Sequence, residues 1–304
     1  MIQQTDLTNS ADLLEEEYDE LTHMVDDLIV PGVSLLAADP KSGKSYLMLY
    51  LSYCVATGQP AFGNKRAVKE GKVLYMALED NNSRLQKRLK EIRKADLLAS
   101  FNKPVNLDLF TRGKITMKDR FASLKTLIEA NSYDMVVIDI LQNIRKSSES
   151  RSYSNEYNLL KNLGDVAHAT DTAIVVVHHT KKGGSKSPMQ KVSGTQGLTG
   201  AADNIIVIER NGTGSVLDLN VKGRDVDEHQ FYLEYGTDEG FYKQLNDPPT
   251  SRNKQAKMDR AWELDQQGWT QQEVAEVLGH KQPYVCKLLK AKREQLEKQQ
   301  NTEE

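Results

Sequence analysis

One stretch, residues 38–45, constrains the fold of this chain more than any other. It reads Ala-Asp-Pro-Lys-Ser-Gly-Lys-Ser, follows the apolar segment 33–37 and precedes a second apolar run that begins at Tyr46. This order predicts a buried strand, a tight loop and a packed helix. Such a loop directs backbone N–H groups and a helix N-terminus at one point, where a phosphate chain can bind. The alternative is an ordinary strand–turn–helix that contains Gly-Lys-Ser by chance.

The residue types in this loop suit a triphosphate. Gly43 lets the backbone approach closely, Lys44 supplies a positive charge for the β- and γ-phosphates, and Ser45 supplies a hydroxyl for Mg²⁺. Ala38 stands where such loops usually begin with glycine, and it is only one methyl group larger. We therefore expect ATP and Mg²⁺ to bind here. The expected contacts come from Ala38, Asp39, Pro40, Lys41, Ser42, Gly43, Lys44 and Ser45.

Three further segments have the composition of strands buried on both faces. With the polar residues that end them, they are 72–79 (Glu79), 134–139 (Asp139) and 172–179 (His178 and His179). Apolar residues at nearly every position are typical of parallel sheets that helices cover on both sides. Helical patterns lie at residues 83–94, 118–130 and 156–169. The sequence therefore predicts an α/β fold with a central, mostly parallel sheet.

The ends of these strands should meet, although they are far apart in the sequence. Open α/β sheets bind ligands at the carboxyl ends of their strands. We therefore expect the following residues at one edge: Lys44, Glu79, Asp139 and His179. Asp139 is a candidate for holding Mg²⁺, directly or through water, and Glu79 for the catalytic base that activates water. His178 and His179 are candidates for sensing the γ-phosphate or the attacking water.

Each of these assignments has a simpler alternative. A carboxylate that follows a strand is often a helix N-cap, and this role suits Asp80 better than Glu79. Two adjacent histidines can bind zinc. However, no Cys or acidic residue accompanies His178 and His179 at the spacing of zinc ligands.

In this order, the motifs resemble those of the RecA-like ATPases. They are the phosphate loop, Ala-Leu-Glu-Asp at 77–80, Val-Val-Ile-Asp at 136–139 and Val-Val-His-His-Thr-Lys-Lys-Gly at 176–183. Within that class the chain is most similar to the plasmid replicative helicases of the RepA type and their phage and mobile-element relatives. The resemblance covers roughly residues 30–245. The paired histidines favour the RepA type over the DnaB and RecA branches, because those branches usually carry glutamine at the position of His179.

The resemblance implies a homo-oligomeric ring, with a hexamer as the expected form, whose ATP sites lie between subunits. It also implies that Glu79 is the catalytic base and that His179 senses the γ-phosphate. Lys222 and Arg224, at the end of an expected strand over 215–221, are implied to reach into the neighbouring subunit's site as a finger pair. Without the resemblance, these two residues would be read as a solvated turn. Arg210 is a second candidate for the finger.

Two polar, basic loops, 144–155 and 181–200, leave the same edge of the expected sheet. In RecA-like rings the corresponding loops line the central channel, so the resemblance implies contacts with the phosphates of single-stranded DNA. The expected contact residues are Lys181, Lys182, Lys186 and Lys191. Without the resemblance, loops of this composition are read as mobile surface connections.

The chain changes character near residue 246, and residues 246–253 have the composition of a linker. Residues 254–304 follow, and a three-helix pattern without strands is expected over 254–294. Thr270 and Glu273 match a capping box, and Pro283 suits the first position of the next helix. Cys286 is expected in the core of these helices. Their expected apolar positions are Val274, Ala275, Val277, Leu278, Val285, Leu288 and Leu289.

This terminal stretch resembles the helix-turn-helix ends of resolvases and repressors. Between Lys281 and Arg293 there are five basic residues and no acidic one, which favours contact with DNA, duplex DNA included. The candidate contacts are Lys281, Gln282, Tyr284, Lys287 and Lys290. The alternative is a protein-docking module, which uses the same three-helix fold.

Composition limits the class of protein. The chain is 38% hydrophobic and 27% charged, without an apolar run near the ~20 residues of a membrane span or the pattern of a signal peptide. We therefore expect a cytoplasmic protein with no membrane partner and with Cys54 reduced in the core. Residues 1–29 contain no Lys or Arg and form the expected acidic N-terminal arm. This arm is read as a solvated helix, or as a segment that packs on another subunit or a basic partner.

The sequence thus predicts an acidic arm at 1–29, a RecA-like ATPase core at 30–245, a linker at 246–253 and a helix-turn-helix domain at 254–304. The expected function is that of a ring-forming, ATP-dependent helicase on single-stranded DNA, of a plasmid, phage or other mobile element. Two alternatives remain. One is an ATP-switched DNA-binding or recombination-mediator protein that does not unwind DNA. The other is a helix-turn-helix regulator whose ATPase sets only its oligomeric state.

Overall fold

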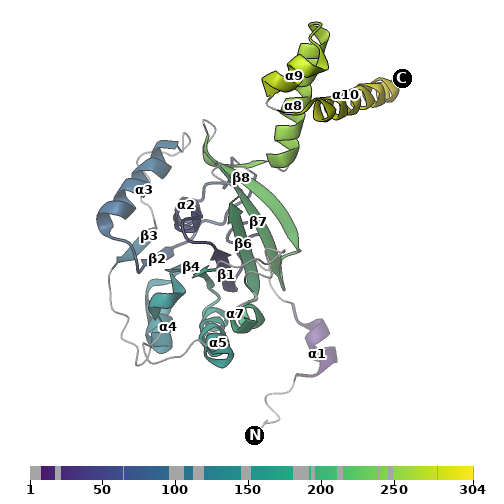
Figure 1. The fold of residues 1–304 in the computed structure, drawn as a ribbon. Coiled ribbons are helices and arrows are strands. Elements are labelled where there is room, and N and C mark those ends of the chain that lie inside the picture. Colours follow the sequence, from purple (N-terminus) through teal and green to yellow (C-terminus); the bar gives the residue numbers. More distant parts are fainter. Residues whose placement is uncertain are drawn as a thin grey trace.

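A single nine-stranded sheet forms the centre of the protein, seen here in a computed structural model (Figure 1). The structure describes residues 8–17, 22–63, 65–95, 106–111, 120–144, 152–180, 192, 196–210, 215–237, 240–245, 249–278 and 280–303. The strand order is β3-β2-β4-β5-β1-β6-β7-β8-β9. Strands β1 to β6 pair only in parallel with one another, and β6 to β9 form an antiparallel meander. The expected α/β fold with a mostly parallel sheet is therefore confirmed.

The strands of the sheet are β1 (Gly32–Ala38), β2 (Val73–Ala77), β3 (Leu107–Thr111), β4 (Met135–Asp139), β5 (Ala173–His179), β6 (Asn204–Arg210), β7 (Val216–Gly223), β8 (His229–Thr237) and β9 (Gly240–Leu245). The helices are α1 (Ser10–Glu15), α2 (Lys44–Thr57), α3 (Asn82–Ala95), α4 (Arg120–Asn131), the 3₁₀ helix η2 (Leu141–Ile144), α5 (Tyr153–Ala169), α7 (Gln196–Ala201), α8 (Pro249–Gln266), α9 (Gln271–Leu278) and α10 (Gln282–Glu303).

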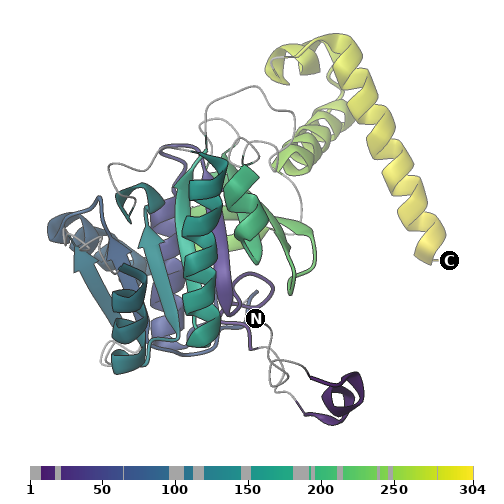
Figure 2. The ribbon, with the colours of Figure 1, turned by 90° about the horizontal axis from the view of Figure 1, so that it is seen from below.

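Helices cover both faces of the parallel half of the sheet. Helices α2 and α3 lie on one face, and α4, α5 and α7 lie on the other (Figures 1 and 2). All seven residues of β1 are buried, and they alternate between the two layers. Leu36 packs toward α2, whereas Leu35 and Ala37 pack toward α5. The continuous apolar runs in the sequence therefore arise because each strand has helices on both sides.

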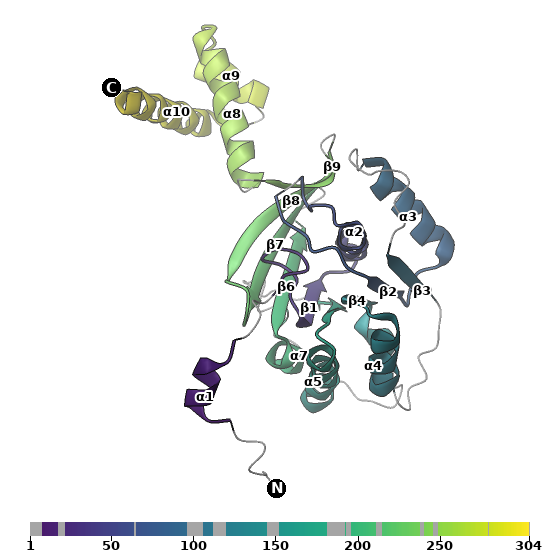
Figure 3. The same ribbon diagram turned by 180° about the vertical axis from the view of Figure 1, so that it is seen from behind.

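The N-terminal segment differs from the expected arm over 1–29. Helix α1 is exposed and projects from the sheet (Figure 3), in agreement with a solvated helix. Residues after it behave differently, because Met24, Val25, Leu28 and Ile29 are buried in the layer that contains α2. The sequence did not predict the burial of these apolar residues, because acidic residues surround them.

Helices α8, α9 and α10 form a hydrophobic cluster of their own. Helix α8 begins at Pro249, inside the stretch expected to be a linker, because proline is favourable in a first helical turn. The expected capping box is present: the Thr270 backbone N–H donates to Glu273 Oε2 at 2.8 Å, and the Glu273 N–H donates to Thr270 Oγ1 at 3.4 Å. The buried positions of α9 and α10 are Val274, Ala275, Val285, Leu288 and Leu289.

Two expectations for these helices were wrong. Val277 is 52% exposed although it was expected on the apolar face of α9. Cys286 is exposed, because its neighbour Val285 takes the inward position on α10. Cys54 is buried and reduced, as expected. Among the described helices, none combines the length and the apolar composition needed to cross a bilayer.

Candidate active site

The carboxyl ends of β1, β2, β4 and β5 lie together, and we call this rim of the sheet the catalytic edge. The strand register brings the ends together: Ala38 lies opposite His179, and Asp139 lies between Ala77 and Val177. Glu79 follows β2, and Lys44 begins α2 directly after the loop that leaves β1. The structure thus brings together the four residues that the sequence placed at one edge, Lys44, Glu79, Asp139 and His179.

The loop between β1 and α2 has the backbone of a phosphate-binding turn. Gly43 adopts a left-handed conformation with φ +96° and has open space where a Cβ would stand. Lys41 is also left-handed, with φ 63°. The Ser42 side chain is buried, and its Oγ has no hydrogen-bond partner among the described residues. The Thr180 hydroxyl donates to the Asp39 carboxylate, which ties the loop to the end of β5.

Lys44 is buried and contacts His179 directly. Its Nζ donates to Nδ1 of His179 at 2.7 Å and lies 3.5 Å from the backbone oxygen of Asp39. A charged lysine can only donate, so Nδ1 of His179 is the acceptor and the ring is neutral. Burial lowers the pKa of Lys44, while Asp139, Glu79 and Asp39 act in the opposite direction. The ammonium therefore lies near three carboxylates that favour its charged form.

We predict a pH-dependent stability that depends on His179. Burial, and then the charge of Lys44, lower the pKa of His179 from its usual 6.5. The unfolded chain therefore takes up this proton at a higher pH than the folded protein does. The free energy of unfolding should therefore stay constant above about pH 6.5. It should decrease as the pH falls from there to the pKa of His179 in the folded protein.

The test compares urea unfolding of the wild type and of His179→Gln, followed by circular dichroism at pH 7.5 and 5.5. We expect the wild type to lose more stability between these pH values than the variant does. Equal losses in the two proteins would show that His179 is not the titrating group.

Asp139 is held by a tyrosine that the sequence did not single out. The hydroxyl of Tyr75, buried in β2, donates to Asp139 Oδ2 at 2.7 Å and lies 3.2 Å from the backbone oxygen of Ser45. Burial, and then Asp139, raise the pKa of Tyr75 well above its usual value, so the phenol stays a donor. This contact fixes Asp139 beside the first turn of α2. In the sequence, Tyr75 is only one apolar position in a buried strand.

Glu79 and Asp80 have different surroundings. Glu79 is exposed at the catalytic edge, where a water molecule can reach its carboxylate. Asp80 is buried and accepts hydrogen bonds from Arg84, at 2.6 Å, and from Arg88. The expectation that Asp80 caps α3 was wrong, because Oδ1 of Asn81 accepts the Arg84 backbone N–H at 2.9 Å.

His178 lies on the other face of the sheet from His179. Successive residues of a strand point to opposite faces, and Nδ1 of His178 lies 3.5 Å from Nε2 of Gln142 in η2. Of the two candidate sensors, only His179 contacts Lys44.

A pocket of about 330 Å³ adjoins the phosphate loop on the side of α3 and the antiparallel strands. We call it the aromatic pocket, and its lining residues are Lys41, Ser42, Gly43, Tyr46, Glu91, Arg210, Leu217, Tyr235, Phe241 and Tyr242. Arg210, the second candidate for the finger, lies here at the end of β6, and its guanidinium donates to the Tyr235 hydroxyl at 2.6 Å. The sequence pattern did not reveal this pocket, because its walls combine the phosphate loop, α2 and α3 with the strands β6 to β9, which are far away in the sequence.

Lys222 and Arg224 lie at the opposite edge of the sheet from Lys44. Gly223, between them, pairs with Asn204 at the start of β6, which runs parallel to β1. Lys222 Nζ contacts Glu228 at 2.7 Å, and Arg224 contacts Asp203 at 3.0 Å. Neither residue can belong to the site that its own chain forms with Lys44.

The DNA-binding candidates fall into two groups. Lys181, Lys182, Lys186 and Lys191 lie outside the described residues. In the C-terminal helices, Lys281, Gln282, Lys287 and Lys290 are exposed. Tyr284 is half-buried and packs against His280, with ring centroids 4.6 Å apart and planes inclined by 47°, so part of its ring serves packing within the helices.

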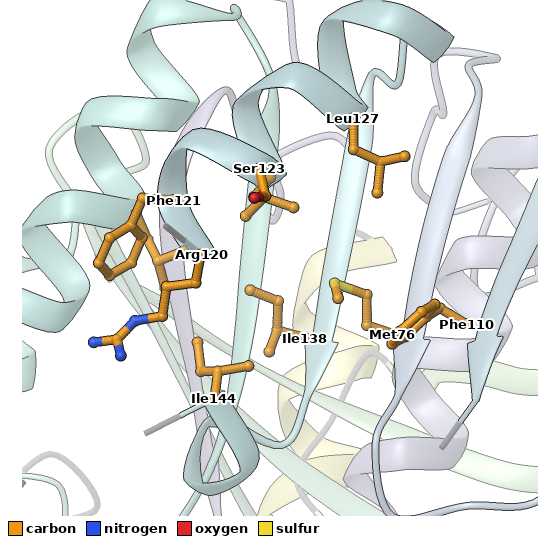
Figure 4. Close-up of a pocket in the computed structure, with 10 residues that line it drawn as sticks. Met76, Phe110, Arg120, Phe121, Ser123, Leu127, Ile138 and Ile144 are labelled. Carbon is orange, nitrogen blue, oxygen red and sulfur yellow. The ribbon is translucent and has the colours of Figure 1, made fainter. Parts of the chain in front are cut away.

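A second, apolar cavity of about 120 Å³ lies beneath α4, on the face of the sheet away from α2 (Figure 4). Met76 and Ile138 line it from the sheet, Phe121 and Leu127 from α4. Arg120 is the one charged residue among its lining residues. This cavity offers apolar packing and carries none of the groups needed for catalysis at the edge.

The chain is similar to known proteins in sequence and in fold. A family model described as an AAA domain matches residues 3–185. The ATPase domain of G40P superposes with a TM-score of 0.55 at 16% identity, over 71% of this chain and 85% of that one. A KaiC-like protein from the archaeon Pyrococcus horikoshii gives a TM-score of 0.49 at 12% identity, over 71% and 91% of the two chains. No curated protein matches in sequence. The likeness to the G40P domain shows a shared RecA-like fold.

Proposed function

Because the chain belongs to the family of AAA domains and is a nucleotide-binding ATPase, we propose that it hydrolyses ATP with Mg²⁺ at the catalytic edge. We further propose that this reaction drives a ring of subunits along single-stranded DNA, as in replicative helicases of the RepA type. The observation that carries the proposal is the convergence of Lys44, Glu79 and Asp139 from three separate strand ends. Their chemistry is that of phosphoryl transfer.

The residues at this edge fit a magnesium-bound triphosphate. The buried Ser42 hydroxyl lacks a protein partner among the described residues, and the open space at Gly43 leaves room for phosphate oxygens. Ser45 and Asp139 would hold Mg²⁺, since a hydroxyl and a carboxylate are ligands that this ion prefers. When bound, Mg²⁺ neutralises charge on the phosphate oxygens.

The protein groups around this site have separable tasks. Lys44 places an ammonium next to the phosphate loop, and His179 keeps that ammonium in position through the 2.7 Å contact. The Glu79 carboxylate, exposed to solvent, accepts the proton of the attacking water. Tyr75 orients Asp139 through the hydrogen bond to Oδ2, which leaves Oδ1 of Asp139 available to bind Mg²⁺.

A ring is part of the proposal because the finger residues lie away from their own site. Arg224 is 67% exposed and points from the edge opposite Lys44. In a head-to-tail ring, one subunit's exposed edge faces the next subunit. Arg224 and Lys222 would then reach the neighbour's phosphates, where an arginine stabilises the charge of the transition state.

The DNA contacts are proposed at two places. β5 ends at the catalytic edge, and the lysines that follow it in the sequence, Lys181, Lys182, Lys186 and Lys191, would bind the phosphates of a single strand. Helices α9 and α10 would act as a helix-turn-helix that presents Lys281, Gln282, Lys287 and Lys290 to DNA.

We expect the protein to separate a forked DNA duplex in the presence of ATP and Mg²⁺, with ATP hydrolysis stimulated by single-stranded DNA. Gel or fluorescence assays on a labelled fork measure both. Lys44→Ala, which removes the ammonium, serves as the inactive control. If DNA stimulates hydrolysis but the fork stays paired, the protein is an ATP-switched DNA-binding protein and the helicase proposal is wrong.

A further inference from the structure

Arg88 of α3 links a side chain of the aromatic pocket to the turn that carries Glu79. On one side of Arg88 lies Tyr46, the residue after Ser45, with the guanidinium carbon 5.0 Å from the centre of its ring. On the other side, Arg88 donates to the buried carboxylate of Asp80. Asp80 directly follows Glu79 in the short turn between β2 and α3. Contacts of this kind are charge-assisted and directional.

The pocket has the surfaces that a flat aromatic ligand requires. Tyr46 stacks on Phe241, with ring centroids 5.3 Å apart and planes inclined by 16°. Tyr235 and Tyr242 add further rings to the lining, and Glu91 and Arg210 supply polar groups. Base–aromatic stacking is favourable for every nucleobase, because each base has a π-face.

The pocket also has the right position and size. Ser42 and Gly43 of the phosphate loop belong to its lining, so the pocket directly adjoins the place where the loop would hold a phosphate chain. Its volume of about 330 Å³ is within the range of about 300–1,000 Å³ that is usual for small-molecule sites.

We propose that the aromatic pocket binds the base of the nucleotide, and that Arg88 is a positioning residue that couples an occupied pocket to the placement of Glu79. This inference rests on the proposed ATP hydrolysis. A base in the pocket restrains the Tyr46 ring. Arg88, packed between that ring and Asp80, then holds the turn that carries Glu79 in the geometry needed for attack by water.

Arg84 provides a matched control within the same network. It also donates to Asp80, at 2.6 Å, and its side chain is 55% exposed against 19% for Arg88. Among the described residues, an aromatic contact is recorded for Arg88 and none for Arg84. A role that only stabilises Asp80 would make each arginine affect the turnover of substrates with and without a base in equal proportion, whereas coupling to the pocket requires an effect of Arg88 that is specific to ATP.

The experiment compares ATP with inorganic tripolyphosphate, which has the phosphates but no base. In the wild type we expect kcat for tripolyphosphate to be roughly tenfold or more below kcat for ATP. Arg88→Gln should lower kcat for ATP by roughly tenfold while KM changes by less than about threefold, and should leave tripolyphosphate turnover unchanged. Arg84→Gln should stay within about twofold of the wild type on both substrates.

Two further variants separate binding from coupling. Phe241→Leu keeps an apolar side chain but removes a stacking ring, so ATP affinity measured by calorimetry should fall on the order of tenfold while tripolyphosphate affinity is kept. Arg88→Lys keeps the charge beside Asp80 but not the flat guanidinium, so it should recover only part of the ATP turnover. Full recovery with lysine would reduce Arg88 to an ion-pair partner of Asp80 and overturn the coupling.

The proposal is also overturned if Arg88→Gln lowers turnover of both substrates in equal proportion, or if Arg84→Gln has the same effect as Arg88→Gln. Equal wild-type turnover of ATP and tripolyphosphate would show that the aromatic pocket does not act as a base site, but it would not contradict the proposed ATP hydrolysis. Absence of any ATP turnover in the wild type would instead remove the proposed function itself.

Discussion

Replacement of Glu79 by glutamine is expected to lower kcat for ATP hydrolysis by about 10²–10⁴-fold, the usual contribution of a general base. Glutamine has the same size but cannot accept the proton of the attacking water. Because Glu79 is exposed, the substitution should leave the fold intact. ATP and single-stranded DNA should bind the variant about as tightly as they bind the wild type, as measured by calorimetry and fluorescence anisotropy.

Glu129→Gln is a suitable control for this substitution. Glu129 lies on α4, on the other side of the sheet, and forms an exposed pair with Lys125 at 3.7 Å. Its replacement should leave turnover unchanged. Near-normal turnover of Glu79→Gln would exclude Glu79 as the base.

Replacement of Arg224 by alanine is expected to lower ATP turnover by about 10³–10⁵-fold, as for other arginine fingers. The reason is geometric. Arg224 lies at the edge opposite its own phosphate loop, beside Asp203, so a finger role requires that its charge act on a neighbouring subunit. A variant that fails for this reason keeps an intact phosphate loop and should still bind ATP.

Mixed rings test this sharing of sites. Subunits with Arg224→Ala retain Lys44, and subunits with Lys44→Ala retain Arg224, so a mixture contains some complete sites. We expect mixing to restore part of the turnover that each variant lacks alone. Arg260→Ala, which removes an exposed arginine of α8 paired with Glu263, should remain active. No recovery on mixing, or full activity of Arg224→Ala by itself, would contradict a finger that acts between subunits.

The parallel half of the fold could be predicted from sequence because its signals are local. Continuous apolar runs that end in Glu79, Asp139 and His179 identify buried parallel strands, and the rule for strand ends places these residues on one rim. The strand register confirms that convergence. Neither Tyr75 nor Thr180 could be found in this way, because each acts through a partner at or just after the end of a different strand.

Competition between neighbouring polar groups limited the rest of the prediction. Asp80 and Asn81 are both good N-cap residues, and the choice depends on Arg84 and Arg88, which draw the Asp80 carboxylate into ion pairs. The aromatic pocket depends on the packing of β9 against α2, which sets Phe241 beside Tyr46. The periodicity of each segment cannot predict such contacts, because the two elements are far apart in the sequence. Similarly, the acidic composition of the N-terminal segment gave no indication that Met24 and Val25 are buried.

The most direct test of the account is calorimetric titration of Mg-ATP into the wild type and into Lys44→Ala, with circular dichroism to verify that both are folded. The account predicts saturable binding to the wild type and an affinity at least about a hundredfold weaker in the variant, a change of about 2.7 kcal/mol. Equal affinity in the two proteins would show that the triphosphate does not lie against Lys44, and the catalytic edge would not be the nucleotide site.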